Sequence, residues 1–378
     1  MRISVLAYQL RVGGALSVGR NVVAALARVA DDHEYQFILP AGAGYEDLPK
    51  PSCASCVYYR RPAGAIGQLW FEGFHVPGLV RAFSPQVVWG MANSALRRPQ
   101  AKQAILFHKP QFIYGPEQTR LETRWIRWRN ELARRRLRAH LKSTQLVFCQ
   151  TSVAAERFRR CFDYGGRIAI MPNAVSRQSR AGSPQERPAA LRSRAGRFTL
   201  FCLTRYYAHK NLEALCETFE RHGEALRDVA VVLTIAPGQH PRAALLLERI
   251  ARPGLREHFI NVGPLRQDEL AAYYAHTDGL ILPTLLESFS GSYLEAMQFG
   301  RPILTSDFDF AREVCGPAAL YFDPFDPADI CRAIRELRDQ PERATALIEA
   351  GQARLQTYVR DWDAIVRDAL GELCAIAG

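Results

Sequence analysis

Short apolar runs alternate with longer segments of helical periodicity throughout the first half of the chain. Each run is a few residues long and rich in Val, Ile, Leu or aromatic residues, which is typical of buried strands. Alternation of strands with helices favours a parallel sheet joined by crossover helices. The strands expected here are Ile3–Ala7, Tyr35–Leu39, Val57–Tyr59, Val87–Trp89, Ala104–Phe107, Leu146–Cys149 and Ile168–Met171.

The same pattern starts again after a polar stretch at 176–188, which is rich in Arg, Ser, Gly and Pro and is typical of an exposed linker. We therefore predict an α/β protein with two Rossmann-like domains, an N-terminal one over 1–180 and a C-terminal one over 190–359. In tandem doubly wound sheets the carboxyl-end loops border a crevice, and we expect the functional site there. The strands expected in the second half are Phe198–Leu203, Val229–Ile235, Phe259–Val262, Gly279–Leu282, Pro302–Thr305 and Leu320–Phe322.

The last segment of the chain has apolar residues at helical spacing, namely Ile365, Val366, Leu370 and Leu373. In tandem folds of this kind a final helix can return to the first domain. We therefore expect a helix at 360–378 that crosses back to the N-terminal domain.

Of the 378 residues, 48% are hydrophobic and 23% are charged, which fits a globular protein and excludes a disordered or fibrous one. No apolar run is long enough to span a bilayer, and the start of the chain lacks a signal-peptide core, so a cytoplasmic location is expected. The nine cysteines are scattered, and the close pair Cys53 and Cys56 has no second pair to complete a zinc site. We expect no metal, no disulfide framework and no cofactor other than a co-substrate.

A net charge of +11 calls for acidic partners, and nucleic acid, anionic lipid and a phosphorylated substrate all qualify. The basic residues are densest at 120–142, in one segment rather than in a stripe along the chain. Leu121, Trp125, Trp128 and Leu132 have helical spacing there, with arginines around them. Two interpretations stay open for this helix: an interfacial membrane anchor, or a core-facing helix whose other face is solvated.

The most informative stretch reads LPTLLESFSGSYLEAMQFGRP from Leu282 to Pro302. A strand is expected to end at Leu282, and apolar spacing predicts a helix that begins near Gly291. Amides at the amino end of a helix can hold a phosphate or a sugar hydroxyl, and carboxylates beside them can bind pairs of hydroxyls. The candidate binding residues in this stretch are Glu287, Ser290, Gly291, Ser292 and Glu295.

This stretch resembles the Glu-x7-Glu motif of the retaining family 4 glycosyltransferases, which have the GT-B fold. The resemblance includes the Ser-Phe-Ser-Gly turn and the closing Glu-Ala-Met-x-x-Gly-x-Pro. It implies two Rossmann-like domains that face a central cleft, with Glu287 beside the donor sugar as a catalytic residue and Glu295 on the ribose of the nucleotide. The alternative, two surface carboxylates at a helix cap, fits the glutamates but not the whole run.

A second loop, LTRYYAHKNL at 203–212, follows an expected strand and precedes a helical stretch. Arg205 and Lys210 can neutralise the charge on a diphosphate leaving group. The loop resembles the Gly-Arg-x-x-x-x-Lys-Gly loop of the same family, with Thr204 and Asn211 where glycine is usual. The alternative is a solvated basic loop.

Two weaker candidates lie in the first half. Gly13 and Gly14 follow the first strand and resemble the N-terminal Gly-Gly loop of the family, where backbone approaches the donor phosphates or the acceptor. The alternative for this pair is a simple turn. His108 follows the expected strand Ala104–Phe107 and is a second catalytic candidate, able to hydrogen-bond the transferred sugar or the acceptor, or else a structural histidine.

Together these residues predict a retaining hexosyltransferase that moves mannose or a similar sugar from a GDP- or UDP-sugar to a glycan or lipid-linked acceptor. The resemblance implies bacterial surface polysaccharide or lipopolysaccharide synthesis, and it would place segment 120–142 on the inner face of the cell membrane. The alternatives are a sugar-nucleotide epimerase or phosphorylase on the same fold, and a basic nucleic-acid-binding protein. The chain has no nucleic-acid recognition motif, so nucleic acid is not expected as a partner.

Overall fold

The computed structural model describes residues 1–29, 32–60, 67–68, 70–93, 95–174, 186–192, 196–358 and 361–378. The chain forms two compact units. Unit 1 consists of Met1–Ile113, Arg124–Ala174 and Arg360–Gly378, and unit 2 consists of Tyr114–Thr123 and Val175–Val359. The predicted first domain, 1–180, thus differs from unit 1 at Tyr114–Thr123, which groups with unit 2. The expected linker at 176–188 lies outside the described residues except for 186–188.

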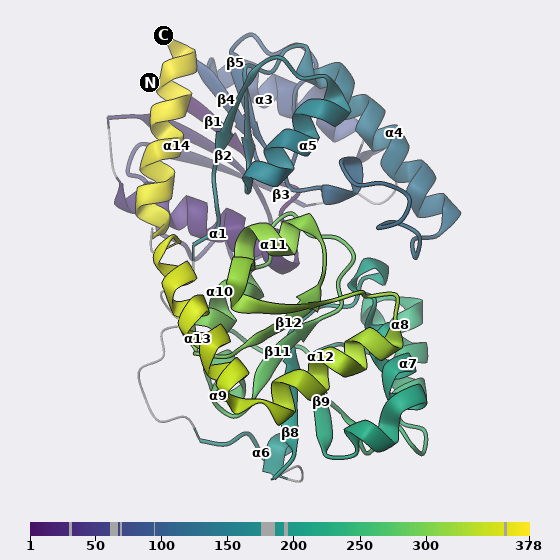
Figure 1. Ribbon diagram of the computed structural model, residues 1–378. Coiled ribbons are helices and arrows are strands. Elements are labelled where there is room, and N and C mark those ends of the chain that lie inside the picture. The colour runs from purple at the N-terminus through teal and green to yellow at the C-terminus, as the bar shows by residue number, and fades with distance from the viewer. Residues whose placement is uncertain are drawn as a thin grey trace. The chain divides into compact units, whose positions relative to one another are not determined.

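Unit 1 is built on a parallel sheet with the strand order β3-β2-β1-β4-β5-β6-β7 (Figure 1). Every pairing in it is parallel, and the seven strands expected from the apolar runs are confirmed with small shifts at their ends. Strand order reverses between β1 and β4, which are neighbours in the sheet. The strands are β1 Arg2–Leu6, β2 Glu34–Pro40, β3 Ala54–Tyr59, β4 Val87–Gly90, β5 Lys102–Leu106, β6 Leu146–Cys149 and β7 Arg167–Ile170.

Helix α14 completes the core of unit 1. It packs beside α1 (Figure 1), and Val366 and Leu373 are fully buried in the same cluster as Val22 of α1. At the surface, Arg28 forms an ion pair with Asp363 at 2.5 Å. The helices of unit 1 are α1 Gly13–Arg28, α3 Val76–Phe83, α4 Arg124–Leu141, α5 Ser152–Phe162 and α14 Trp362–Ala377.

Unit 2 repeats the design with the strand order β10-β9-β8-β11-β12-β13, again all parallel. The central strands are buried on both faces, which explains why they are continuous apolar runs rather than alternating ones. All six expected strands are confirmed. They are β8 Phe198–Cys202, β9 Val229–Leu233, β10 Phe259–Asn261, β11 Gly279–Leu282, β12 Ile303–Ser306 and β13 Ala319–Phe322.

Helices flank this second sheet, and α7 and α12 lie side by side in Figure 1 and contact each other. Several begin at the residues that sequence rules favour. Asp326, for example, accepts a hydrogen bond from the backbone amide of Ala328 and so caps α12, which has Pro327 as its first residue. The helices of unit 2 are α6 Ala189–Arg192, α7 Leu212–His222, α8 Pro241–Ile250, α9 Leu270–Ala275, α10 Gly291–Gln298, α11 Asp309–Cys315, α12 Pro327–Asp339 and α13 Pro341–Gln356.

Candidate active site

The two candidate loops of unit 2 leave the sheet side by side. Strands β8 and β11 are neighbours at the point where the strand order reverses, and loops 203–211 and 283–290 follow their carboxyl ends. This is the position at which doubly wound sheets bind ligands. The loops are joined by a backbone hydrogen bond of 2.8 Å, which the amide of Leu285 donates to the carbonyl of His209.

An ion pair between Lys210 and Glu287 links the same two loops. Only 16% of the lysine side chain and 13% of the glutamate side chain are exposed. A charge so far from water is costly unless it has a partner, and in this pair the two opposite charges compensate each other. The pair therefore brings together two of the candidate residues and presents opposite charges at the switch point.

Helix α10 begins at Gly291, where the sequence predicted it. Its N-cap residue, Ser290, makes no capping hydrogen bond with its side chain, so no side chain of the cap competes for the amides of Gly291 and Ser292. These amides can donate hydrogen bonds to an oxyanion or to a hydroxyl oxygen, and the positive end of the helix dipole favours a negative charge there.

Glu295 lies in the second turn of α10 and is separate from the Lys210–Glu287 pair. The hydroxyl of Tyr274 in α9 donates a hydrogen bond of 3.2 Å to its carboxylate, and Gln267 bonds to it as well. Burial raises the pKa of Glu295 despite these two hydrogen bonds, which act in the opposite direction. The carboxylate is thus held in place by two neutral donors, and no cation among the described residues forms an ion pair with it. It can therefore accept hydrogen bonds from neutral hydroxyls.

Arg205 is exposed, and among the described residues none forms an ion pair with its guanidinium. The two departures from the family loop have local explanations. Asn211 adopts a left-handed conformation with φ of 54°, which asparagine tolerates better than most residues, and its side chain donates to the carbonyl of Pro324 at 2.8 Å. Thr204 does not need a positive φ and is fixed by Thr234, which bonds to both its amide and its carbonyl.

Neighbouring side chains fix the basic loop at 203–211 through hydrogen bonds around Tyr206. The hydroxyl of Tyr206 donates to Glu213 at 2.5 Å, and Arg242 donates to the same carboxylate at 2.8 Å. Gln239 accepts from the amide of Tyr206 at 2.8 Å. With its backbone fixed in this way, the loop can present Lys210 without a large loss of conformational entropy on binding.

Segment Tyr114–Thr123, which was expected in the first domain, packs against this loop. Its Glu122 carboxylate lies 3.9 Å from the ring of His209, and both side chains are nearly buried. Burial is the main cause that lowers the pKa of His209 to about 3, and the charge of Lys210 adds to it. His209 is therefore neutral at physiological pH, and Lys210 is the cation of the loop that faces Glu287.

The two candidates of unit 1 follow strands of its own sheet. Gly14 lies in the first turn of α1, the helix that follows β1 at the switch point of that sheet, and a side chain there would meet open space. His108 follows β5, and its amide donates to Asn93 at 3.1 Å. Burial lowers the pKa of His108 to about 4, although a hydrogen bond with Gln150 raises it. Its imidazole is therefore neutral and can donate or accept a hydrogen bond.

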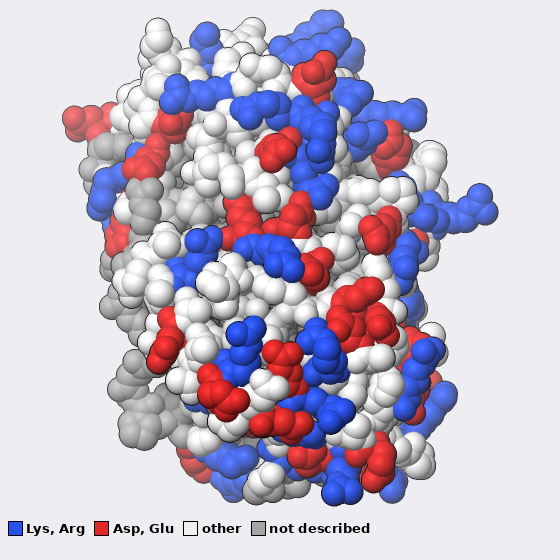
Figure 2. All heavy atoms as spheres, viewed as in Figure 1, with Lys and Arg blue, Asp and Glu red and all other residues white. Residues whose placement is uncertain are grey.

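Helix α4 is shorter than the expected basic helix and turns its tryptophans outward. It begins at Arg124, so Leu121 is not part of it. Trp125 is 64% exposed and Trp128 57%, whereas the buried side chains are Asn130, Leu137 and Leu141. The core-facing interpretation is thus wrong for the tryptophan face. Figure 2 shows Lys and Arg side chains gathered where Figure 1 draws α4 and α5.

The structure thus brings together Lys210 of the basic loop and Glu287 of the loop that leads to α10, with Glu295 farther along that helix. Sequence reasoning missed Glu122, Tyr274 and Gln267, because their roles depend on contacts between distant segments. His209 could have been flagged, since it directly precedes the candidate lysine. No group of acidic, histidine and cysteine side chains among the described residues could hold a metal ion. None of the described helices is long and apolar enough to cross a membrane.

Comparisons with known proteins bear on unit 2 most directly. Residues 197–340 match the family model described as Glycosyl transferases group 1. The 2-deoxystreptamine glucosyltransferase of Streptomyces kanamyceticus is 28% identical over 117 residues, and this match spans 30% of each protein.

Solved structures match the fold over nearly the whole chain. Sucrose-phosphate synthase from Thermosynechococcus elongatus has a TM-score of 0.78 at 15% identity and covers 99% of this chain and 98% of its own. Anabaena HepE in complex with UDP-glucose has a TM-score of 0.74 at 15% identity, and the match covers 99% of this chain and 100% of HepE. The chain therefore has the two Rossmann-like sheets of the GT-B fold, and the match over 197–340 supports a group 1 glycosyltransferase.

Proposed function

We propose that this protein is a retaining glycosyltransferase that moves a hexosyl group from a nucleoside diphosphate sugar to an acceptor hydroxyl. The Lys210–Glu287 pair at the switch point of unit 2 carries the proposal. The pair joins a basic loop to the acidic loop that leads into α10, inside the range that matches the group 1 model. The diphosphate of a nucleotide sugar would bind to the basic loop, and its sugar hydroxyls would bind to the loop that contains Glu287.

In this proposal the diphosphate is bound by Arg205, Lys210 and the amides of Ser290, Gly291 and Ser292. These groups meet a leaving group that gains negative charge as the glycosidic bond of the donor breaks, so they stabilise the transition state more than the bound substrate. Arg205 has no ion-pair partner among the described residues and is free to turn toward the phosphates.

Glu295 accepts hydrogen bonds from the ribose hydroxyls, and Glu287 accepts from hydroxyls of the transferred sugar. Glu287 also forms the ion pair with Lys210, so loss of either member leaves the other without its partner. On unit 1, His108 and Gly14 remain candidates for contacts with the sugar, the phosphates or the acceptor. His108 would serve as a neutral hydrogen-bonding group, in keeping with its lowered pKa.

The uracil nucleotide is the preferred donor of the two that the sequence left open, because HepE binds UDP-glucose on the same fold. A hexose follows from the same likeness. The acceptor is proposed to be a glycan or a lipid-linked glycan of a bacterial surface polysaccharide. The exposed face of α4, with Trp125 and Trp128 among arginines, would then rest on the anionic inner surface of the membrane where such acceptors lie.

The donor site is tested by calorimetry and thermal shift of the full chain with UDP, GDP, ADP and dTDP. UDP is expected to bind and to raise the melting temperature, and Lys210→Met and Glu295→Gln should each weaken binding at least ~10-fold. Arg227→Met is the matched control, because Arg227 is an exposed cation of unit 2 in a pair with Glu224. Absence of binding by all four nucleotides, or equal binding in all variants, would refute the donor site.

The reaction is tested by product analysis with UDP-hexoses. A new glycosidic product with the donor's anomeric configuration supports the proposal, whereas an isomerised donor or a sugar phosphate would indicate the epimerase or phosphorylase alternative. Membrane contact is tested by co-sedimentation with vesicles. Trp125→Ser/Trp128→Ser should lose binding to phosphatidylglycerol vesicles, and phosphatidylcholine vesicles should not bind either form. Unchanged binding of the double variant would exclude α4 as the membrane face.

A further inference from the structure

A second polar pocket of unit 2 lies at the edge of the sheet opposite to the candidate donor loops. It has a volume of about 520 Å³ and is lined by residues at or just before the amino ends of β8, β9, β11 and β12. Parallel strands have all their amino ends at one edge, and the donor loops follow the carboxyl ends. The two places are therefore separated by the length of a strand, which is about 15 Å for five residues.

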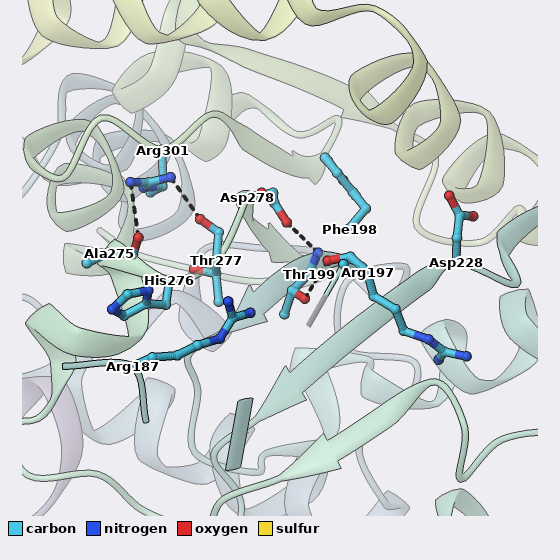
Figure 3. Close-up of a pocket in the computed structure, with 11 residues that line it drawn as sticks. Arg187, Arg197, Phe198, Thr199, Asp228, Ala275, His276, Thr277, Asp278 and Arg301 are labelled. Carbon is cyan, nitrogen blue, oxygen red and sulfur yellow. Dashed lines mark hydrogen bonds between the residues drawn. The ribbon is translucent and has the colours of Figure 1, made fainter. Parts of the chain in front are cut away.

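Three arginines from separate segments line the pocket, and in Figure 3 Arg187 points toward its middle whereas Arg301 is turned to the carbonyls of Ala275 and Thr277. Arg301 donates to the carbonyls of Thr277 at 3.0 Å and Ala275 at 3.4 Å, and its Nε is buried without an acceptor among the described residues. The Nε of Arg187 is buried and without an acceptor in the same sense. Arg197 points away in Figure 3 and donates to the carbonyl of Glu257.

The carboxylates at the pocket are engaged with other donors. Asp278 accepts the amide of Thr199 at 2.6 Å, and Asp228 forms an ion pair with Arg338 at 2.6 Å. Burial lowers the pKa of Arg301, and the charge of Asp278 compensates in part. Arg187 and Arg301 thus place two guanidinium groups at the pocket, each with a buried Nε–H that has no acceptor among the described residues, and both acids of the pocket have donors of their own.

We propose that this pocket binds a small phosphate monoester between Arg187 and Arg301. A phosphate monoester is nearly a dianion at neutral pH and has enough oxygens to accept from both guanidinium groups, for which arginine is the preferred residue. The volume leaves room for an organic group of the size of a sugar. His276 also lines the pocket and lies between Ala275 and Thr277, the residues whose carbonyls orient Arg301.

Three elements connect this pocket to the donor loops. Strands β8 and β11 begin in the pocket and end at loops 203–211 and 283–290. Helix α10 begins at the donor loop. After its carboxyl end, the backbone amide of Arg301 donates a hydrogen bond of 2.8 Å to the carbonyl of Ala296 in the helix. A ligand on Arg301 would thus alter the helix that holds Ser290 and Glu295. This coupling rests on the proposed function, whereas binding in the pocket does not.

The test measures binding of glycerol 3-phosphate and of inorganic phosphate to the full chain by calorimetry, with glycerol as the uncharged control. Saturable binding of glycerol 3-phosphate is expected, at least ~10-fold weaker in Arg187→Gln and partly restored in Arg187→Lys. The matched control is Arg192→Gln, because Arg192 is an exposed arginine of α6 paired with Glu186. Arg301→Lys is a second variant that keeps a donor for the carbonyls of Ala275 and Thr277.

Lys210→Met distinguishes the two anion sites. If phosphate binding is lost in Lys210→Met and kept in Arg187→Gln, the ligand occupies the donor site and the proposal is wrong. Absence of saturable binding in the wild type overturns it as well. Coupling predicts that glycerol 3-phosphate changes the Kd of UDP by about fivefold or more, and that Arg187→Gln abolishes the change. Failure of UDP to bind would count against the proposed function while leaving the pocket measurement intact.

Discussion

The Lys210–Glu287 pair allows a quantitative test of how unit 2 holds its charges. Removal of one member leaves the other as a mostly buried charge without a partner, which costs about 3–5 kcal/mol in buried pairs. Because 16% and 13% of the two side chains stay exposed, we expect the lower end, about 3 kcal/mol, for Lys210→Met and for Glu287→Gln. The double variant leaves no unpaired charge, so its free energy of unfolding should decrease by only about 1 kcal/mol, since replacing both members is far less costly than removing one.

Urea denaturation of the full chain measures these differences. At a slope of about 2 kcal/mol per molar, a loss of 3 kcal/mol lowers the midpoint by roughly 1.5 M. Circular dichroism follows both units, whereas tryptophan fluorescence follows unit 1, because all five tryptophans belong to it. A shift seen by circular dichroism but not by fluorescence therefore locates the loss in unit 2.

The control is the exposed pair of Arg227 and Glu224 in unit 2, whose side chains are 79% and 92% exposed. Arg227→Met should cost less than about 0.5 kcal/mol, because a solvated pair gains little. If the double variant at Lys210 and Glu287 costs the sum of the single changes, the two charges are independent. The reasoning from burial would then be refuted.

Three further outcomes are expected. Burial lowers the pKa of His108 to about 4, so the folded state resists protonation of this side chain, and the free energy of unfolding should decrease by about 3 kcal/mol from pH 6.5 to pH 4. Urea denaturation followed by fluorescence should show a smaller decrease in His108→Asn. An identical decrease in the variant would contradict the argument. Burial raises the pKa of Glu295, which means that its charged form destabilises the fold at neutral pH. Glu295→Gln should therefore raise the melting temperature while it weakens UDP binding. A lower melting temperature in the variant would contradict this prediction. Leu373→Ala in α14 opens a cavity in the core of unit 1 and should cost about 3 kcal/mol in the fluorescence-detected melt, with Leu245→Ala, at a 61% exposed position of unit 2, as the control that should change little.

The sheets could be predicted from sequence because buried parallel strands are short apolar runs bounded by polar residues. The start of α10 at Gly291 was also predictable, since turn residues and helical spacing agree there. Helix α4 shows where such reasoning fails. Its buried face has Asn130 and its exposed face has Trp125, so hydrophobicity alone points the helix the wrong way.

The contacts that shape the site were not accessible in the same way. Glu122 lies in a segment that local pattern assigns to the basic helix, yet its carboxylate is buried beside His209, far along the chain. Tyr274 and Gln267 hold Glu295 from α9 and the loop before it, and neither belongs to a motif. Pairings of this kind depend on how distant elements pack, and a single sequence has no signal for them.

The place of α14 in unit 1 has a consequence for how the protein is made. A ribosome releases the chain from its amino end, and domains usually fold in that order. Here the core of unit 1 includes Trp362, Val366 and Leu373, which are synthesised only after every segment of unit 2. Unit 2 can gather all of its segments before then, although its main part starts only at Val175. Unit 2 is thus expected to fold first during translation. A stop codon shortly before Trp362 would leave unit 2 complete and the core of unit 1 without α14.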